Sequence, residues 1–375
     1  MAIDNKDKKV LNVPHLRFPE FSGEWVTKSI NDLAVVIGGG TPDTTVKSYW
    51  DGEIQWFTPS EIGKNKYVDS SLRTITEVGL NNSSAKLLPP NTILLSSRAT
   101  IGECSLSLRE CATNQGFQCL VSKKCNVDFL YYLIQTKKKD LIRKSCGSTF
   151  LEISANEVRK IQVSVPSDVE QQKIAELLSL IDERIATQNK IIERYESLIR
   201  GIAQNVIRSN KPNVLLSECL ECSSSTLQES DVCENGTYPV YGANGIVGYL
   251  DDYNTEDEAV HIIKDGSGVG TVSYATGRCS ATGTLNTLQA KDGYLLQYLY
   301  YMLKVFNFEP YKTGMAIPHI YFKDYGKAKI FCPSYTEQLK YVELLSAIDN
   351  KLSAEQSILT NLSLQKQYLL RQMFI

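Results

Sequence analysis

Apolar residues recur at alternating steps of four and three between Pro166 and Ile207. This spacing predicts one long helix with a narrow apolar seam that faces a partner helix. Ser167 and Glu170 form a capping-box signal at its start, and a helix of about forty residues is roughly 60 Å long. Gln188 is the polar interruption of the seam. The apolar seam residues are Ile174, Leu178, Ile181, Ile185, Ile192, Tyr195, Ile199, Ile202 and Val206.

A second helix with the same pattern is predicted from Pro333 to Ile375. At an offset of 167 residues, Glu170-Gln171 aligns with Glu337-Gln338, and Gln188 aligns with Glu355. We interpret the match as an internal duplication. The two helices are therefore expected to be partners. Gln188 and Glu355 would form a shared polar layer if they lie near the midpoint of an antiparallel pair, which the sequence does not settle. The apolar seam residues of the second helix are Leu345, Ile348, Leu352, Leu359, Leu362, Leu369 and Met373.

The stretches before the two helices are predicted to be diverged copies of one globular domain. Phe129-Leu130-Tyr131-Tyr132-Leu133 recurs as Tyr298-Leu299-Tyr300-Tyr301-Met302, and 96–102 aligns with 264–270. The predicted fold is α+β: two tandem α/β domains separated by two long antiparallel coiled-coil helices, with an internal pseudo-two-fold repeat. The predicted segments are domain 1–165, helix 166–210, domain 211–332 and helix 333–375.

Turn and strand signals give local predictions for the first domain. Asp51-Gly52 lies between strand-forming residues and predicts a hairpin turn. The segment 93–97 is a candidate buried strand, and the segment 118–122 is predicted to be another strand. The aromatic run that begins at Phe129 is expected to open a helix that ends in the Lys137–Lys139 run.

Length and charge narrow the class of protein. The 375 residues allow two or three domains. A polar start and the lack of any long apolar run predict a cytoplasmic protein with reduced cysteines. Residues 1–166 carry 21 Lys and Arg against 17 Asp and Glu, whereas residues 211–333 carry 9 against 14. A DNA-binding role would therefore rely on local patches or on partner subunits.

No motif predicts catalysis or a metal site. A nucleotide-binding P-loop is missing, and Gly266 to Gly270 is expected to be a turn between strands. His15, His261 and His319 lie in no nucleophile motif. Cys219 and Cys222 form a lone pair without further ligand spacing. We therefore predict no catalytic residue, no metal and no cofactor in this chain.

Several motifs, repeated in order around the two helices, resemble one known family. They are Gly39-Gly40-Thr41-Pro42, Tyr49-Trp50-Asp51-Gly52-Glu53-Ile54-Gln55-Trp56, Asn114-Gln115-Gly116-Phe117, Tyr238-Pro239-Val240-Tyr241-Gly242-Ala243-Asn244-Gly245, Asp265-Gly266-Ser267, and the helix starts with downstream Ile181-Asp182 and Ile348-Asp349. With these features the chain resembles the specificity (S) subunit of type I restriction-modification enzymes.

The resemblance implies a DNA-recognition subunit that is not itself catalytic. In such subunits two target-recognition domains each read one half of a split double-stranded DNA sequence. The two long helices hold the domains apart and dock the modification subunits, here expected to be two. Those subunits bind S-adenosylmethionine and methylate adenine, and separate restriction subunits use ATP and Mg²⁺. Because the two domains have diverged, the expected DNA site is asymmetric, and the helices would set the half-site spacing.

Candidate base-reading residues follow from side-chain chemistry. Arg, Lys, Asn and Gln read base edges best, with Ser and Thr assisting. In the first domain the candidates are Lys64, Lys66, Tyr67, Ser97, Arg98, Asn114 and Gln115. In the second domain they are Tyr241, Asn244, Lys264, Ser267, Thr282 and Asn286.

Two other functions stay open at the level of sequence. One is a stand-alone nuclease or methyltransferase with an undetected site. The other is a coiled-coil assembly protein whose globular halves bind proteins. Sequence-specific DNA binding by a complex with the modification subunit would separate both from the DNA-recognition role.

Overall fold

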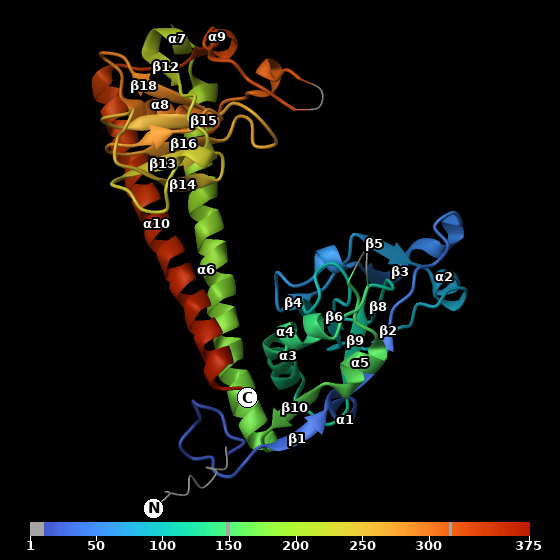
Figure 1. Cartoon of the computed structure of the whole chain (residues 1–375). Helices are drawn as coiled ribbons and strands as arrows, with labels where there is room; N and C mark the ends of the chain where they lie inside the picture. The colour runs from blue at the N-terminus through green and yellow to red at the C-terminus, as the bar shows by residue number, and fades with distance from the viewer. Residues whose placement is uncertain (1–10, 148–150, 315–316) are drawn as a thin grey trace, which may run out of the picture. The chain divides into compact units, whose positions relative to one another are not determined.

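The computed structural model describes residues 11–147, 151–314 and 317–375 (Figure 1). It divides into two compact units, residues 1–189 with 358–375 and residues 190–357. This division differs from the predicted four segments, because both long helices pass from one unit into the other. Each unit therefore contains one globular domain together with the beginning of one helix and the end of the other.

The first unit contains three sheets. The largest has the strand order β2-β9-β6-β7-β4, a second has the order β5-β3-β8, and β1 pairs with β10. The pair β1–β10 brings the start of the domain next to the residues that lead into the long helix α6. The elements are β1 (Val26–Ser29), α1 (Ile30–Leu33), β2 (Ala34–Gly38), β3 (Trp50–Phe57), β4 (Tyr67–Val68), β5 (Arg73–Ile75), α2 (Glu77–Asn81), β6 (Ile93–Leu95), β7 (Cys104–Ser107), β8 (Cys111–Thr113), β9 (Gln118–Ser122), α3 (Val127–Thr136), α4 (Lys138–Arg143), α5 (Ala155–Lys160) and β10 (Gln162–Val165).

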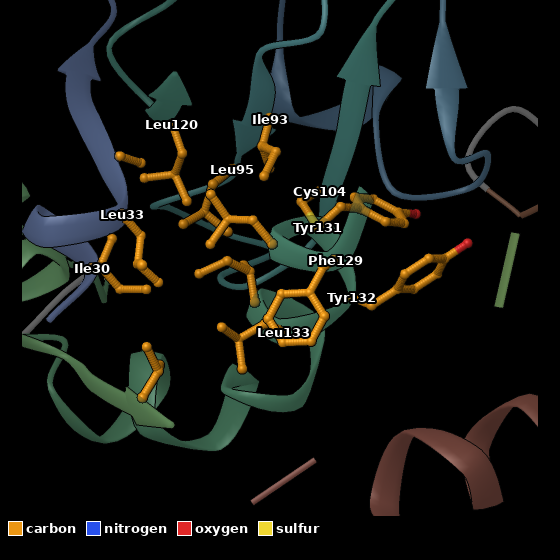
Figure 2. Packing of buried hydrophobic residues seen from close by; sticks show 14 of the residues in the cluster. Ile30, Leu33, Ile93, Leu95, Cys104, Leu120, Phe129, Tyr131, Tyr132 and Leu133 are labelled. Carbon is orange, nitrogen blue, oxygen red and sulfur yellow. The ribbon is translucent and has the colours of Figure 1, made fainter. Parts of the chain in front are cut away.

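Helix α3 packs against the largest sheet to form the main core of the first unit. Phe129 and Leu133 approach Leu95 and Leu120 of the strands (Figure 2). All four side chains are fully buried. Tyr132 also belongs to this core, but Figure 2 shows its hydroxyl directed away from the other labelled side chains. The hydroxyl is therefore available for a contact outside the sheet.

The second unit repeats this topology. The order β12-β18-β15-β16 matches β2-β9-β6-β7, and β14-β13-β17 matches β5-β3-β8, including one antiparallel and one parallel pairing. The duplication inferred from the helices thus extends through the domains. The elements are β11 (Val214–Leu215), α7 (Leu216–Cys219), β12 (Leu220–Ser224), β13 (Tyr238–Gly242), β14 (Gly245–Leu250), β15 (Ala259–Ile263), β16 (Val272–Ala275), β17 (Ser280–Ala281), β18 (Leu285–Ala290), α8 (Leu296–Leu303), α9 (Phe322–Tyr325) and β19 (Lys329–Ile330).

The two long helices are α6 (Asp168–Ser209) and α10 (Tyr335–Gln372). In the first unit they run in opposite directions, since Ile174 of α6 shares a core with Met373 near the end of α10, and Asp182, further along α6, pairs with Lys366, earlier in α10. Among the described residues, no helix combines the length and the apolar character needed to cross a bilayer.

Most seam residues are withdrawn from solvent. Ile174, Leu178, Ile181, Gln188, Ile192, Leu345 and Leu352 are buried, and Ile185, Ile348, Glu355, Leu359 and Leu362 are half-buried.

One local prediction is wrong. Asp51 and Gly52 form no hairpin turn but lie in a bulge inside β3, where the register with β5 shifts between Trp50 and Ile54. Asp51 has a φ of 61°, and a side chain at Gly52 would meet the carbonyl oxygen of Ile75 at 2.6 Å. A bulge needs the same backbone freedom as a turn.

The helix that begins near Phe129 ends at the lysine run, as predicted. The last residue of α3 is Thr136 and its C-cap is Lys137, and Lys138 and Lys139 begin a further helix, α4.

Candidate nucleic-acid interface and helix joints

A buried glutamine joins each globular domain to the start of its long helix. Gln171 is 4% exposed, and its Nε2 donates to the carbonyl oxygen of Pro166 (3.0 Å). Its Oε1 accepts from the backbone N–H of Asn126 (3.1 Å) and from the thiol of Cys125 (3.2 Å). Asn126 caps α3, so a single amide connects the start of α3 to the start of α6.

The second unit repeats this joint. Gln338 is 1% exposed, and its Nε2 donates to the carbonyl oxygen of Pro333 (3.0 Å). Its Oε1 accepts from the backbone N–H of Leu295 (2.8 Å), the residue before α8. The duplicated Glu-Gln pairs were predicted only as helix starts. Their buried glutamines in fact bond to backbone groups at the start of the long helix and in the adjoining domain.

A tyrosine–aspartate hydrogen bond is the second duplicated contact. The Tyr132 hydroxyl of α3 donates to Asp182 Oδ2 of α6 (2.7 Å), and the Tyr301 hydroxyl of α8 lies 3.4 Å from Asp349 Oδ2 of α10. Burial first, and then the nearby carboxylate, raises the pKa of both tyrosines above the ordinary value. Both hydroxyls therefore stay protonated and act as donors. The repeated Ile-Asp pairs thus hold each domain against its helix.

At the first joint, where α6 begins, Glu170 makes additional side-chain contacts. Glu170 is buried and accepts a bidentate pair from Arg17, Nε to Oε1 at 2.7 Å and a second guanidinium nitrogen to Oε2 at 2.8 Å. The Trp25 indole N–H lies 3.3 Å from Glu170 Oε1. The hydrogen bond with Glu170 raises the pKa of Arg17. The predicted capping box is therefore only half formed here, since Ser167 accepts from the Glu170 N–H but the carboxylate turns to Arg17.

At the second helix the other half of the capping box is formed, because the carboxylate of Glu337 turns back to Ser334 while the Glu337 N–H donates to the Ser334 carbonyl oxygen (2.9 Å). Glu337 Oε2 accepts from both the N–H (3.3 Å) and the hydroxyl (2.8 Å) of Ser334. The same sequence signal therefore has different uses in the two units, because only the first unit supplies an arginine and a tryptophan from the preceding segment.

Two DNA-reading candidates of the first domain point into the protein. The Lys66 side chain is 7% exposed, forms an ion pair with Asp128 (2.6 Å) and donates to Ser179 Oγ of α6 (2.7 Å). Ser97 is fully buried. Neither side chain can reach a base edge in this conformation. We therefore exclude both from the candidate set.

The other candidates of the first domain remain accessible. Lys64, Tyr67 and Gln115 are exposed, and Asn114 is half-buried with its Oδ1 accepting from the N–H of Gly116 (2.8 Å). Arg98 is partly exposed but is held by Glu152 (2.8 Å).

The candidates of the second domain likewise include accessible side chains and buried ones. Asn244 in the β13–β14 turn and Ser267 after β15 are exposed, whereas Tyr241 and Lys264 are half-buried. Thr282 and Asn286 are buried, and the Asn286 amide donates to the Tyr325 hydroxyl (3.0 Å). Because their polar atoms are enclosed by the domain, we exclude Thr282 and Asn286 as well.

A contact between an acidic and a basic residue occupies the same place in both domains. Arg98 and Glu152 form an ion pair in the first domain, and in the second His319 Nδ1 lies 2.6 Å from Asp265 Oδ1, at the same offset of 167 residues. Isolated β-bridges join the same positions. The acidic and the basic residue exchange places, so a sequence comparison by residue type does not reveal the correspondence.

Arg73 is an exposed cation that the sequence reasoning missed. Its guanidinium lies 3.5 Å from the centre of the Trp50 ring, an arrangement that holds the plane of the group. Among the described arginines of residues 11–165, the other five have a hydrogen-bond or ion-pair partner, and Arg73 has none. Its N–H donors are open to a ligand. The signal in the sequence is an arginine on a strand near two tryptophans.

His261 is buried in the second domain, and neither ring nitrogen has a hydrogen-bond partner among the described residues. Its ring packs on Tyr241, with 5.2 Å between the centroids. Burial lowers the pKa of His261 to about 4. The pKa of histidine in an unfolded chain is about 6.5. The unfolded chain therefore binds the proton first, and the second domain loses stability as the pH falls from about 6.5 to about 4.

We expect His261→Leu to remove this pH dependence. In the natural chain the loss over this range amounts to roughly 3 kcal/mol. The measurement is the urea midpoint of the second domain at about pH 4.5 and about pH 7 for both proteins. If both lose the same stability on acidification, His261 is not the titrating group.

A groove on the long helices exposes apolar side chains within the first unit. It has a volume of about 700 Å³ and is lined by residues 177–188 of α6 with Ile358, Leu362 and Gln365 of α10. Leu180 and Ile358 on its wall are exposed. Apolar groups in such a helix groove are typical of a protein-docking surface.

Comparisons with known proteins agree with this geometry. The family model described as "Type I restriction modification DNA specificity domain" matches residues 22–197 and again residues 216–363. The chain is 40% identical over 179 residues to the type I restriction enzyme MjaIX specificity subunit of Methanocaldococcus jannaschii. That match covers 46% of this chain and 41% of that protein, less than half its length.

Two further matches extend over most of the chain. The type I restriction enzyme EcoprrI specificity subunit of Escherichia coli is 24% identical over 341 residues, 83% of this chain and 84% of that protein. The crystal structure of a type I restriction-modification S subunit from M. genitalium has a TM-score of 0.62 at 19% identity, covering 97% and 99% of the two chains. This structural likeness shows a common fold.

Proposed function

We propose, from the premise that the chain belongs to the type I restriction-modification DNA specificity family, that it reads a two-part DNA sequence through its two domains. The observation that carries the proposal is the duplicated joint. Each domain is fixed to the start of a long helix by a buried glutamine and a tyrosine–aspartate hydrogen bond. Two similar modules on shared helices suit recognition of two half-sites. The differing surfaces of the domains make an asymmetric site the expectation.

The same helices serve as a scaffold in this proposal. The groove of exposed apolar side chains on α6 and α10 suits docking of modification subunits, of which we expect two. Restriction subunits complete a complex that methylates adenine and cleaves DNA. This chain takes no catalytic part. S-adenosylmethionine, ATP and Mg²⁺ are expected on the partner subunits.

The test is DNA binding by the assembled complex. The chain is co-purified with its modification subunit, and the DNA motif is first found by sequencing the methylated bases of a host that expresses both. We expect the complex to bind that motif at least about a thousandfold more tightly than scrambled DNA of equal length. Equal binding to both would refute the proposal. Methyl transfer by the chain alone would instead establish a stand-alone enzyme, an alternative that family membership does not favour.

Single substitutions should affect one half-site each. Gln115→Ala is expected to relax base preference only in the half-site read by the first domain, and Asn244→Ala only in the other. An amide that makes two hydrogen bonds to a base gives about 1–3 kcal/mol of discrimination. The measurement is a competition series in which each base pair of the motif is varied in turn. Loss of preference in both half-sites from either substitution would contradict the assignment.

A further inference from the structure

An ion pair connects the end of α10 to the first joint. Lys366 Nζ lies 2.7 Å from Asp182 Oδ1, while Asp182 Oδ2 accepts from the Tyr132 hydroxyl at 2.7 Å. The side chains of Lys366 and Asp182 are only 19% and 13% exposed. One carboxylate thus binds a domain residue and a residue of the second helix at the same time.

The repeated half of the chain lacks this pair. At the offset of 167 residues, Asp349 corresponds to Asp182, but Ile199 corresponds to Lys366. Ile199 is buried. The same structural position can therefore hold an apolar residue, and the fold alone does not require a lysine there.

The Lys366–Asp182 ion pair lies at the wall of a cavity and is not close-packed on all sides. The cavity has a volume of about 620 Å³ and lies between the first domain and both helices, with Lys66, Glu103, Tyr131, Asp182, Lys366 and Leu370 among its lining residues. Apolar packing is interrupted on this side of the domain. Directional polar contacts are what hold the domain to the helices there.

A shielded ion pair adds little net stability, because removing two charges from water offsets their attraction. Its presence beside a cavity, at a position where the other half of the chain has isoleucine, indicates that the pair acts on the geometry of the domain rather than on its stability. We propose that Asp182 and Lys366 are positioning residues. They fix the orientation of the first domain relative to the two long helices, and this orientation sets the spacing at which the two half-sites are read. This inference rests on the proposed function.

The experiment compares modification complexes that contain the natural chain or a variant. Each is tested for binding to DNA duplexes whose half-sites are separated by the native spacer or by a spacer one base pair longer or shorter. Lys366→Met is expected to reduce the preference for the native spacer by about tenfold, within the range of couplings found in one contact network. Lys351→Met, on an exposed part of α10, is the matched control and should keep the full preference.

A double variant separates positioning from stability. Lys366→Met leaves the Asp182 carboxylate unpaired, whereas Asp182→Asn with Lys366→Met removes that charge and keeps an acceptor for Tyr132. We expect the double variant to regain thermal stability while its spacer preference stays weak. Full spacer preference in either Lys366 variant would overturn the inference and leave the proposed function intact. If the natural complex shows no sequence-specific binding, the proposed function fails and this inference fails with it.

Discussion

Replacing Phe374 by alanine is expected to destabilise the first unit by about 3–5 kcal/mol. Phe374 follows α10, yet its ring stacks on Phe129 of the first domain with 5.3 Å between centroids and meets the edge of Trp25 at 6.4 Å. The side chain is buried in the main core of that unit. Its removal leaves a cavity where the domain and two helices meet, so few neighbours can move in to fill it.

The neighbouring residue provides the control. Ile375 is exposed, so Ile375→Ala should change the unfolding free energy by less than about 0.5 kcal/mol. Chemical denaturation followed by hydrogen exchange reports the stability of each unit separately. A small effect of Phe374→Ala on the amides of α3 would show that the first domain does not depend on this side chain.

Gln171→Leu should have the next largest effect, about 2–4 kcal/mol. The leucine fits the volume approximately but leaves the Asn126 N–H and the Pro166 carbonyl without their partner. The contact with Pro166 is buried and the contact with Asn126 is partly buried, and a buried backbone group without a hydrogen bond costs about 1–3 kcal/mol. Fraying of the first turns of α3 and α6 should accompany the loss.

The adjacent glutamine makes a matched comparison. Gln172 is exposed and bonds only to Glu176 (2.9 Å), so Gln172→Leu should alter stability by no more than about 0.5 kcal/mol. Hydrogen exchange of the Phe129 and Leu130 amides measures the effect on α3. Equal exchange in both variants would mean that the Gln171 amide does not support the joint.

The long helices and the repeat were predictable because the apolar spacing that specifies each helix lies within that helix, and because the same pattern occurs twice in the chain. Helices α6 and α10 each begin two residues after the predicted starting points. Strand β6 consists of three apolar residues within the predicted segment 93–97, and β9 has the predicted bounds. The bulge at Asp51 was not predictable, since turns and bulges favour the same residues and only pairing with β5 and β8 decides between them.

The joints and the candidate interface depend on contacts between residues far apart in sequence. Gln171 was marked by the repeat, but its partner Asn126 lies 45 residues earlier. Lys66 resembles any basic loop residue until the fold places it against Asp128 and Ser179. Arg73 owes its fixed plane to Trp50 on another strand. Residue type predicts what a side chain can bind, whereas burial decides whether a ligand can reach it.

The place of Met373 and Phe374 in the first core has a consequence for synthesis on the ribosome. Residues 1–189 emerge long before residues 358–375, which complete the same compact unit. At roughly 5–20 residues per second the interval is about 10–40 s. During that time Trp25 and Phe129 lack the ring that covers them in the finished protein. The first domain to be made is thus the last to be completed, and a chain interrupted before α10 exposes an aromatic surface that quality control can detect.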